Sequence, residues 1–211
     1  MITLHTWTTP NGRKISIMLE ELGIPYTIKT VNISQGEQFV PEYLAISPNN
    51  KIPAIVDTDA NGETVSVFES GAILTYLAEK TGKLLPASGA ARYKVLEWLN
   101  WQIGGLGPML GQVGFFEVFS KEKSPLASKR FIDEADRLMG VMDRQLAKTT
   151  YLAGEEFSIA DIASYPWMFG VTLMLKPALG EKLDSKPNLR RWMELMAARP
   201  AVQRGMALPK V

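Results

Sequence analysis

Hydrophobic and polar positions in residues 1–83 switch between strand-like and helical spacing. Short apolar runs predict four β-strands, at 2–6, 26–31, 54–57 and 64–68. Apolar residues three and four positions apart predict two helices, at 12–22 and 70–80, and each is followed by a glycine that would end it. The order of these elements predicts a small mixed sheet covered by helices.

The pattern changes after residue 83. Segment 84–90 is a connector of small residues, and no later run reads convincingly as a strand. Helical spacing predicts helices at 92–103, 108–120, 125–146, 159–175 and 187–198, and the tail, 201–208, is compatible with one more. The sequence therefore predicts an α/β domain at 1–83, a linker at 84–90 and an all-helical domain at 91–211.

Segment 104–114 places five glycines and a proline inside a helical pattern. An interior glycine costs up to about 1 kcal/mol relative to alanine, so something should compensate for it. Close approach of a second chain or a ligand would explain the missing side chains. A plain break between two helices would explain them equally well, and the sequence leaves both interpretations open.

Charge and hydropathy narrow the classes of partner. The chain of 211 residues has 23 basic and 22 acidic residues without a block of like charge, which argues against nucleic acid or an anionic membrane as the main partner. No apolar run approaches the roughly 20 residues of a membrane helix, and residues 1–7 lack the features of a secretory signal. We therefore expect a soluble, cytoplasmic protein.

The chain contains no cysteine and a single histidine, His5. This composition excludes structural disulfides, thiolate metal sites and a cysteine nucleophile. His5 sits in a strand-like run, where a structural or surface role is expected. Any thiol chemistry must therefore arrive with a ligand, and we expect no metal cofactor.

Two short segments carry the most chemical information. Segment 49–53 ends in Pro53 just before a predicted strand, where a proline donates no ladder hydrogen bond and can hold a cis peptide bond. Glu69 and Ser70 stand at the start of a predicted helix, where amide hydrogens and the helix dipole attract a carboxylate. Together they indicate a peptide-binding edge beside an anion-binding helix end.

These segments, together with 8–12 and 157–163, resemble the cytosolic glutathione transferases over nearly the whole chain. Segments 9–12, 47–53 and 104–109 are most similar to the bacterial nu-type enzymes, which act as disulfide-bond reductases. The resemblance implies a thioredoxin-like glutathione-binding domain followed by an all-helical domain. It also implies a homodimer that uses glutathione as its substrate or cosubstrate.

The resemblance assigns the sulfur side of the site to Thr9 and Asn11. Much of the family uses a tyrosine, serine or cysteine there, but residues 1–25 contain no tyrosine or cysteine, and Ser16 lies inside the predicted helix. In the family the proline matching Pro53 is cis, and the backbone of Ile52 would pair with the cysteinyl part of glutathione. As isolated residues, Thr9 and Asn11 would be ordinary turn and cap residues.

The two ends of the tripeptide are assigned in the same way. Glu69 would hold the ammonium and Ser70 the carboxylate of the γ-glutamyl end. The glycyl end would face polar side chains, which the resemblance places at Gln38, Asn50 and Lys51. Arg130 would reach the ligand of the other subunit. Loop and helix residues of these types more often face only water.

Ser158 and Asp161 have the spacing of a capping box at the start of a helix, and Phe157 and Ile162 have that of a hydrophobic staple. We assign Asp161 to folding and not to catalysis.

The resulting hypothesis is a detoxifying glutathione S-transferase. It would activate the glutathione thiol and transfer it to an electrophile, a peroxide or a disulfide. Disulfide reduction needs no protein cysteine, because a second glutathione can resolve the mixed disulfide. Two alternatives stay open: a non-catalytic module of the same fold that serves assembly or stress signalling, and a carrier of apolar ligands.

Overall fold

The computed structural model describes residues 1–211, which form two compact units. The first unit comprises Met1–Lys83 and Arg199–Val211, and the second comprises Leu84–Ala198. Residues 199–211 were expected to close the helical domain, but they group with the first unit because they pack against its first helix. The boundaries 1–83, 84–90 and 91–211 stay a prediction for domains that fold independently.

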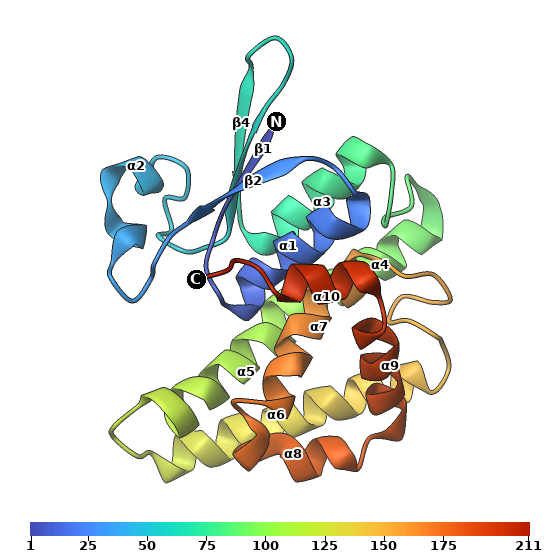
Figure 1. Cartoon of the computed structure of the whole chain (residues 1–211). Coiled ribbons are helices and arrows are strands. Elements are labelled where there is room, and N and C mark those ends of the chain that lie inside the picture. The colour runs from blue at the N-terminus through green and yellow to red at the C-terminus, as the bar shows by residue number, and fades with distance from the viewer. The chain divides into compact units, whose positions relative to one another are not determined.

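A mixed four-stranded sheet forms the centre of the first unit (Figure 1). Its strands are β1 (Ile2–Thr6), β2 (Tyr26–Thr30), β3 (Ala54–Thr58) and β4 (Thr64–Phe68), in the order β2-β1-β3-β4. β1 runs parallel to β2 and antiparallel to β3, and β4 is antiparallel to β3. The predicted mixed sheet is confirmed, and each strand lies within one residue of its expected bounds.

Helices α1 (Pro10–Leu22) and α3 (Ser70–Thr81) lie together on one side of this sheet, and a short helix, α2 (Pro41–Leu44), lies on the other (Figure 1). A 3₁₀ turn, Glu37–Phe39, precedes α2. Helix α1 starts two residues before its predicted start because Thr9 caps it and Pro10 occupies its first turn, where a missing N–H does no harm. Gly23 and Gly82 end the two long helices in the left-handed conformation, as the sequence predicts.

The last helix, α10 (Pro200–Met206), packs along α1 through a close backbone contact. Ser16 donates its hydroxyl to the carbonyl of Gly205 at 2.7 Å, and a Cβ added at Gly205 would lie 2.5 Å from Ile17 Cα. Arg199 donates two hydrogen bonds to Glu21, at 2.7 and 2.8 Å. These contacts explain why the carboxy-terminal segment belongs to the first unit.

Gly205→Ala is expected to lower the free energy of unfolding by about 1–3 kcal/mol, because the new methyl group meets backbone atoms that cannot rotate away. Chemical denaturation measures the change. Gly170→Ala, on a helix position with no neighbouring atom within 4 Å of the added Cβ, is the matched control. The control should be neutral or stabilise by up to about 1 kcal/mol; equal losses in both variants would contradict the packing argument.

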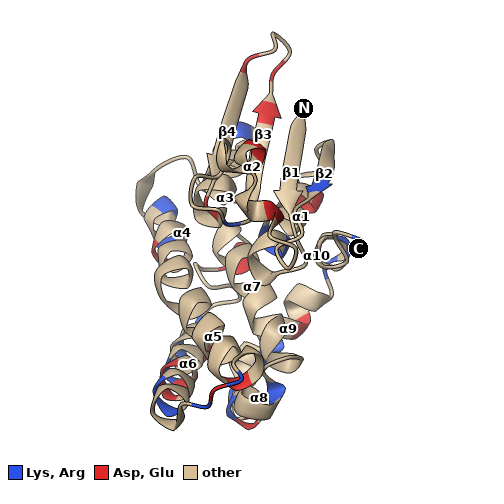
Figure 2. Ribbon diagram, turned by 90° about the vertical axis from the view of Figure 1, so that its left-hand side faces the viewer, with Lys and Arg blue, Asp and Glu red and all other residues tan.

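Helices are the regular elements of the second unit, apart from one isolated bridge, Tyr151 to Gly154. Its helices are α4 (Gly89–Trp101), α5 (Gly107–Gly114), α6 (Pro125–Leu146), α7 (Ile159–Thr172), α8 (Lys176–Asp184) and α9 (Pro187–Ala197). Acidic and basic residues are interspersed along α6 (Figure 2), as expected for a helix with a polar face. Helix α8 was not predicted. None of the helices has the length and apolar character needed to cross a lipid bilayer.

The glycine-rich segment does not break the helix. Two π-helical turns, Gln102–Leu106 and Phe115–Phe119, keep the chain helical from α4 through α5. Pro108 lacks the N–H that an α-helix would direct at the carbonyl four residues back, and the preceding turn is π-helical. A Cβ on Gly107 would lie 2.7 Å from Gln102 Nε2, so the close approach at this position comes from the chain's own side chain.

The predicted capping box begins α7. Ser158 Oγ accepts from the amide of Ala160, and Asp161 accepts from the amide of Ser158 at 3.1 Å. Asp161 is fully buried and also accepts from the indole of Trp192 on α9 at 2.9 Å. Its role in joining segments of the second unit agrees with the assignment to folding.

Candidate functional site

A cavity of about 150 Å³ in the first unit brings together the segments singled out by the sequence. This cavity is called the Ile52 cavity. It is lined by Asn11, Ser47, Lys51, Ile52, Pro53, Phe68, Glu69 and Ser70. Among the predicted site residues, the structure therefore gathers Asn11, Lys51, Ile52, Pro53, Glu69 and Ser70. It does not bring Thr9, Gln38, Asn50 or Arg130 into this lining.

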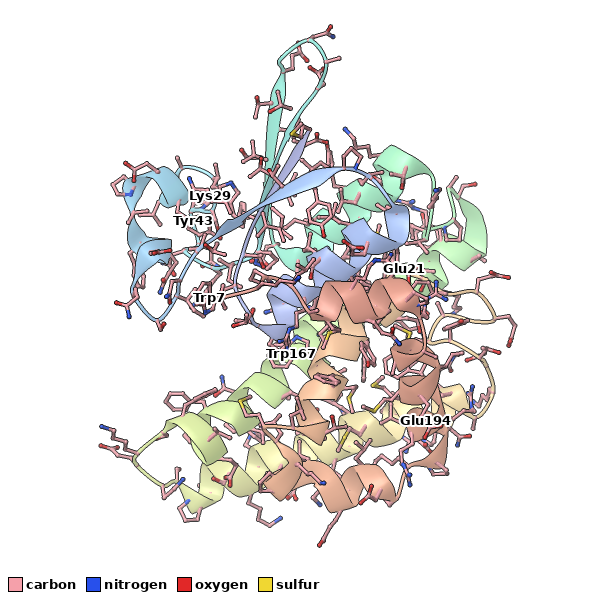
Figure 3. The ribbon with its side chains drawn as sticks, viewed as in Figure 1. Trp7, Glu21, Lys29, Tyr43, Trp167 and Glu194 are labelled. Atoms are coloured by element: carbon pink, nitrogen blue, oxygen red, sulfur yellow. The ribbon has the colours of Figure 1, made fainter.

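The loop before β3 is held by a small apolar cluster on the α2 side of the sheet. Tyr43 and Trp7, both labelled in Figure 3, belong to this cluster together with Val31, Ile52 and Ala54. The Tyr43 hydroxyl donates to the carbonyl of Lys51 at 2.7 Å, and the Ser47 hydroxyl donates to the same carbonyl at 2.8 Å. Anchoring this carbonyl fixes the backbone that leads into Ile52.

Ile52 offers an unpaired stretch of backbone at the cavity. The Ile52–Pro53 peptide bond is cis, and β3 begins only at Ala54. Neither the amide nor the carbonyl of Ile52 makes a hydrogen bond within the protein. Because buried backbone groups are almost always paired, these two groups are suited to an extended peptide laid along the edge.

Glu69 and Ser70 form a corner between β4 and α3. Glu69 has φ of 70° and ψ of 119°, a backbone conformation that residues other than glycine rarely adopt. Such a backbone costs about 1–3 kcal/mol and is found mostly at functional sites. The corner places a carboxylate beside the free amides and positive dipole end of α3.

Lys14, which the sequence analysis did not assign to the site, contacts Ser70 of the Ile52 cavity. Its side chain is 1% exposed and its ammonium donates to Ser70 Oγ at 3.2 Å. Burial lowers the pKa of the Lys14 ammonium to about 7, and the negative charge of Glu69 partly opposes this shift. The available signal was its spacing, because Lys14 lies four residues before the core residue Met18 on the same helical face.

Thr9 and Asn11 occupy the start of α1. Thr9 Oγ1 accepts from the amide of Gly12 at 3.2 Å, which makes Thr9 the helix cap. A hydroxyl that accepts one bond still has its own hydrogen to donate. Asn11 lines the Ile52 cavity directly.

Gln38 and Asn50 take part in local loop structure. The side-chain amide of Gln38 donates to the carbonyl of Ile33 at 3.3 Å. Asn50 has φ of 50°, and its backbone amide donates to the carbonyl of Ser47 at 2.9 Å, so it serves as a turn residue. Ser47 was not predicted as a site residue and lines the cavity while anchoring the loop.

Arg130 belongs to the second unit, on α6, and lines a separate cavity of about 630 Å³. The other lining residues are Met109, Leu126, Lys129, Phe131, Asp133, Glu134 and Arg137. No group of three or more acidic or histidine side chains is arranged to hold a metal ion. Each of the two cavities lies within one unit.

Comparisons with known proteins agree with this geometry. The family model for the glutathione S-transferase N-terminal domain matches residues 8–80, and that for the C-terminal domain matches residues 108–200. The chain is 45% identical to the disulfide-bond oxidoreductase YfcG of Escherichia coli over 100% of this chain and 95% of that protein. It is 41% identical to the disulfide-bond oxidoreductase YghU of Escherichia coli, covering 97% and 73%.

Solved structures give the same result. A glutathione transferase family member from Pseudomonas fluorescens, with two glutathione bound, matches with a TM-score of 0.93 and 45% identity over 99% of this chain and 93% of that one. A glutathione transferase from Pseudomonas putida, with one glutathione disulfide bound per subunit, has a TM-score of 0.93 and 43% identity, covering 99% and 91%. The predicted family is confirmed. The chain belongs to the glutathione S-transferase family.

Proposed function

We propose that this protein binds glutathione in the Ile52 cavity and uses the sulfur of the bound tripeptide to reduce disulfides. The observation that carries the proposal is the unpaired backbone of Ile52, which lies in one cavity with the Glu69 and Ser70 corner. An added strand needs free amide and carbonyl groups, and a free amino acid end needs opposite charges. A tripeptide with a γ-glutamyl end combines an extended backbone with a free amino acid end, so it would use both features of the cavity.

Each part of glutathione has a proposed partner. Ile52 pairs its backbone with the cysteinyl residue, Glu69 faces the γ-glutamyl ammonium, and Ser70 faces the adjoining carboxylate. Lys51 pairs with the glycyl carboxylate. Thr9 and Asn11 act on the sulfur from the start of α1.

Three assignments are supported less directly. Gln38 and Asn50 lie outside the cavity lining and would contact the glycyl end from there. The side chain of Gln38 and the backbone of Asn50 also make hydrogen bonds within the loops. Arg130 would act from the partner subunit of a homodimer. We further propose that this homodimer works in the cytoplasm.

The reaction uses two molecules of glutathione. The first thiolate attacks one sulfur of the disulfide, forms a mixed disulfide and releases the other sulfur as a thiolate, which takes up a proton. The second glutathione attacks the glutathione sulfur of the mixed disulfide. The products are glutathione disulfide and two substrate thiols, and no cysteine of the protein is required. The disulfide-bond oxidoreductase relatives favour this acceptor over an electrophilic carbon or a peroxide.

Steady-state assays with a small disulfide and with an aryl halide test the proposal. We expect glutathione-dependent turnover of the disulfide, at a higher kcat/KM than that of the aryl halide. Calorimetric titration with glutathione provides the binding control. Binding without turnover of either substrate would favour a non-catalytic module, and absence of binding would contradict the site itself.

A further inference from the structure

A buried lysine lies beneath the helix start at which the γ-glutamyl end is proposed to bind. Lys14 projects from α1, and its ammonium reaches the first residue of α3, Ser70, at 3.2 Å. Its side chain is 1% exposed, although lysine is among the residues that are almost never fully buried. Removing an ammonium from water is unfavourable, so its position calls for a compensating role.

The direction of the Lys14–Ser70 hydrogen bond determines what Ser70 can offer to a ligand. A protonated lysine has three hydrogens and no acceptor, so in this form Lys14 donates and Ser70 Oγ accepts. The hydroxyl hydrogen of Ser70 has no acceptor within the protein, and Ser70 lines the Ile52 cavity. This hydrogen is therefore available to an acceptor in the cavity.

The surrounding charges favour an anionic acceptor at this point. The first amides of α3 lack partners within the helix, and the positive end of the helix dipole lies beside them. Lys14, when protonated, adds positive charge on the protein side of Ser70. Glu69, at the same corner, supplies the opposite charge for a neighbouring cation.

We propose that Lys14 is a positioning residue for the γ-glutamyl carboxylate of glutathione, because it orients the Ser70 hydroxyl as a donor and places positive charge beneath it. This inference rests on the proposed binding of glutathione. Lys14 acts through Ser70 and does not contact the sulfur. Its loss should therefore weaken recognition of one carboxylate and should not weaken recognition of the rest of the tripeptide.

Two shortened ligands test that selectivity. Glutaryl-Cys-Gly keeps the carboxylate and lacks the ammonium, whereas 4-aminobutyryl-Cys-Gly keeps the ammonium and lacks the carboxylate. Calorimetry measures Kd for both and for glutathione, with the wild-type protein and with Lys14→Met. We expect Lys14→Met to raise Kd about 10- to 100-fold for glutathione and glutaryl-Cys-Gly, the range of a hydrogen bond that involves a charge. Kd for 4-aminobutyryl-Cys-Gly should not rise, because Glu69 keeps its charge for the ligand ammonium.

Lys186→Met is the matched control for removing a buried lysine. Lys186 is 9% exposed and pairs with Asp136 at 2.5 Å in the second unit, so its loss should leave all three Kd values unchanged. The double variant Lys14→Met, Ser70→Ala should bind glutathione no more weakly than Ser70→Ala alone, since the lysine acts through the serine.

Several outcomes would overturn the inference. Equal weakening of all three ligands by Lys14→Met would assign Lys14 to general structure, and unchanged binding of glutathione would remove its role. Failure of the wild-type protein to bind glutathione would refute the proposed function as well. If Lys14→Met does not fold, the inference is tested by ¹⁵N NMR, which measures the chemical shift of the Lys14 ammonium in the wild-type protein with each shortened ligand. Its signal should shift with glutaryl-Cys-Gly and not with 4-aminobutyryl-Cys-Gly, and the same response to both would contradict the proposal.

Discussion

Replacing Asp161 by alanine is expected to lower the free energy of unfolding by about 3–5 kcal/mol, because the substitution leaves several buried donors without an acceptor. The carboxylate of Asp161 accepts from the amide of Leu152 at 3.0 Å and from the indole of Trp192 at 2.9 Å. It also accepts from the amide and the hydroxyl of Ser158, each at 3.1 Å. Water cannot replace these bonds where the side chain has no exposed surface.

Chemical denaturation of the full chain measures this change. Asp184→Ala is the control, because Asp184 is an exposed aspartate in the same unit and should change stability by no more than about 0.5 kcal/mol. Glutathione affinity should be unchanged in the fraction of Asp161→Ala that is folded. A stability loss below about 1 kcal/mol would contradict the assigned role of Asp161.

Replacing Asn11 by alanine is expected to reduce kcat/KM for disulfide reduction at neutral pH about tenfold or more, through loss of thiolate stabilisation. Lowering a thiol pKa from about 8.5 by two units requires about 2.7 kcal/mol of preferential thiolate stabilisation. The start of α1 supplies about 0.3–1 kcal/mol, or about 2 when partly buried. A hydrogen bond to the charged sulfur, worth about 1.5–3 kcal/mol, supplies the remainder.

Thr9 provides the comparison. Thr9→Ser keeps both the cap and the hydroxyl and should retain activity, whereas Thr9→Ala removes both and should cost about 1 kcal/mol of stability. Because Asn11 lines the cavity and Thr9 does not, we expect the larger kinetic loss for Asn11→Ala. Wild-type kcat/KM in both alanine variants would remove these residues from the catalytic assignment.

Much of the fold could be predicted because its periodicity is strong. Helices α1 and α6 carry clear apolar faces, and the left-handed glycines that end α1 and α3 are visible in the sequence. Helix α8 was missed because only Leu179 and Leu183 of its residues are buried, which leaves too weak an apolar pattern. The glycines near Gly107 left a helix break and a close approach equally open, and the structure shows a continuous helical path with two π-helical turns and a close approach of Gln102 to Gly107.

The candidate site could be predicted where a local motif determines it. Pro53, Glu69 and Ser70 stand at element boundaries that the sequence marks, and they meet in one cavity. Lys14 could not be assigned in this way, since its contact with Ser70 depends on how α1 packs against α3. The roles of Gln38 and Asn50 were also beyond reach, because their hydrogen bonds depend on the path of the loops.

The most direct test of the account is a pH titration of the thiolate absorbance of glutathione bound to the wild-type protein, with Asn11→Ala and Thr9→Ala for comparison. We expect the apparent thiol pKa of bound glutathione to lie well below the value of about 8.5 for a free thiol. At least one variant should raise it by about one pH unit, which corresponds to about 1.4 kcal/mol. A bound thiol that titrates like free glutathione in the wild-type protein would contradict the central claim that this cysteine-free chain activates a captured sulfur.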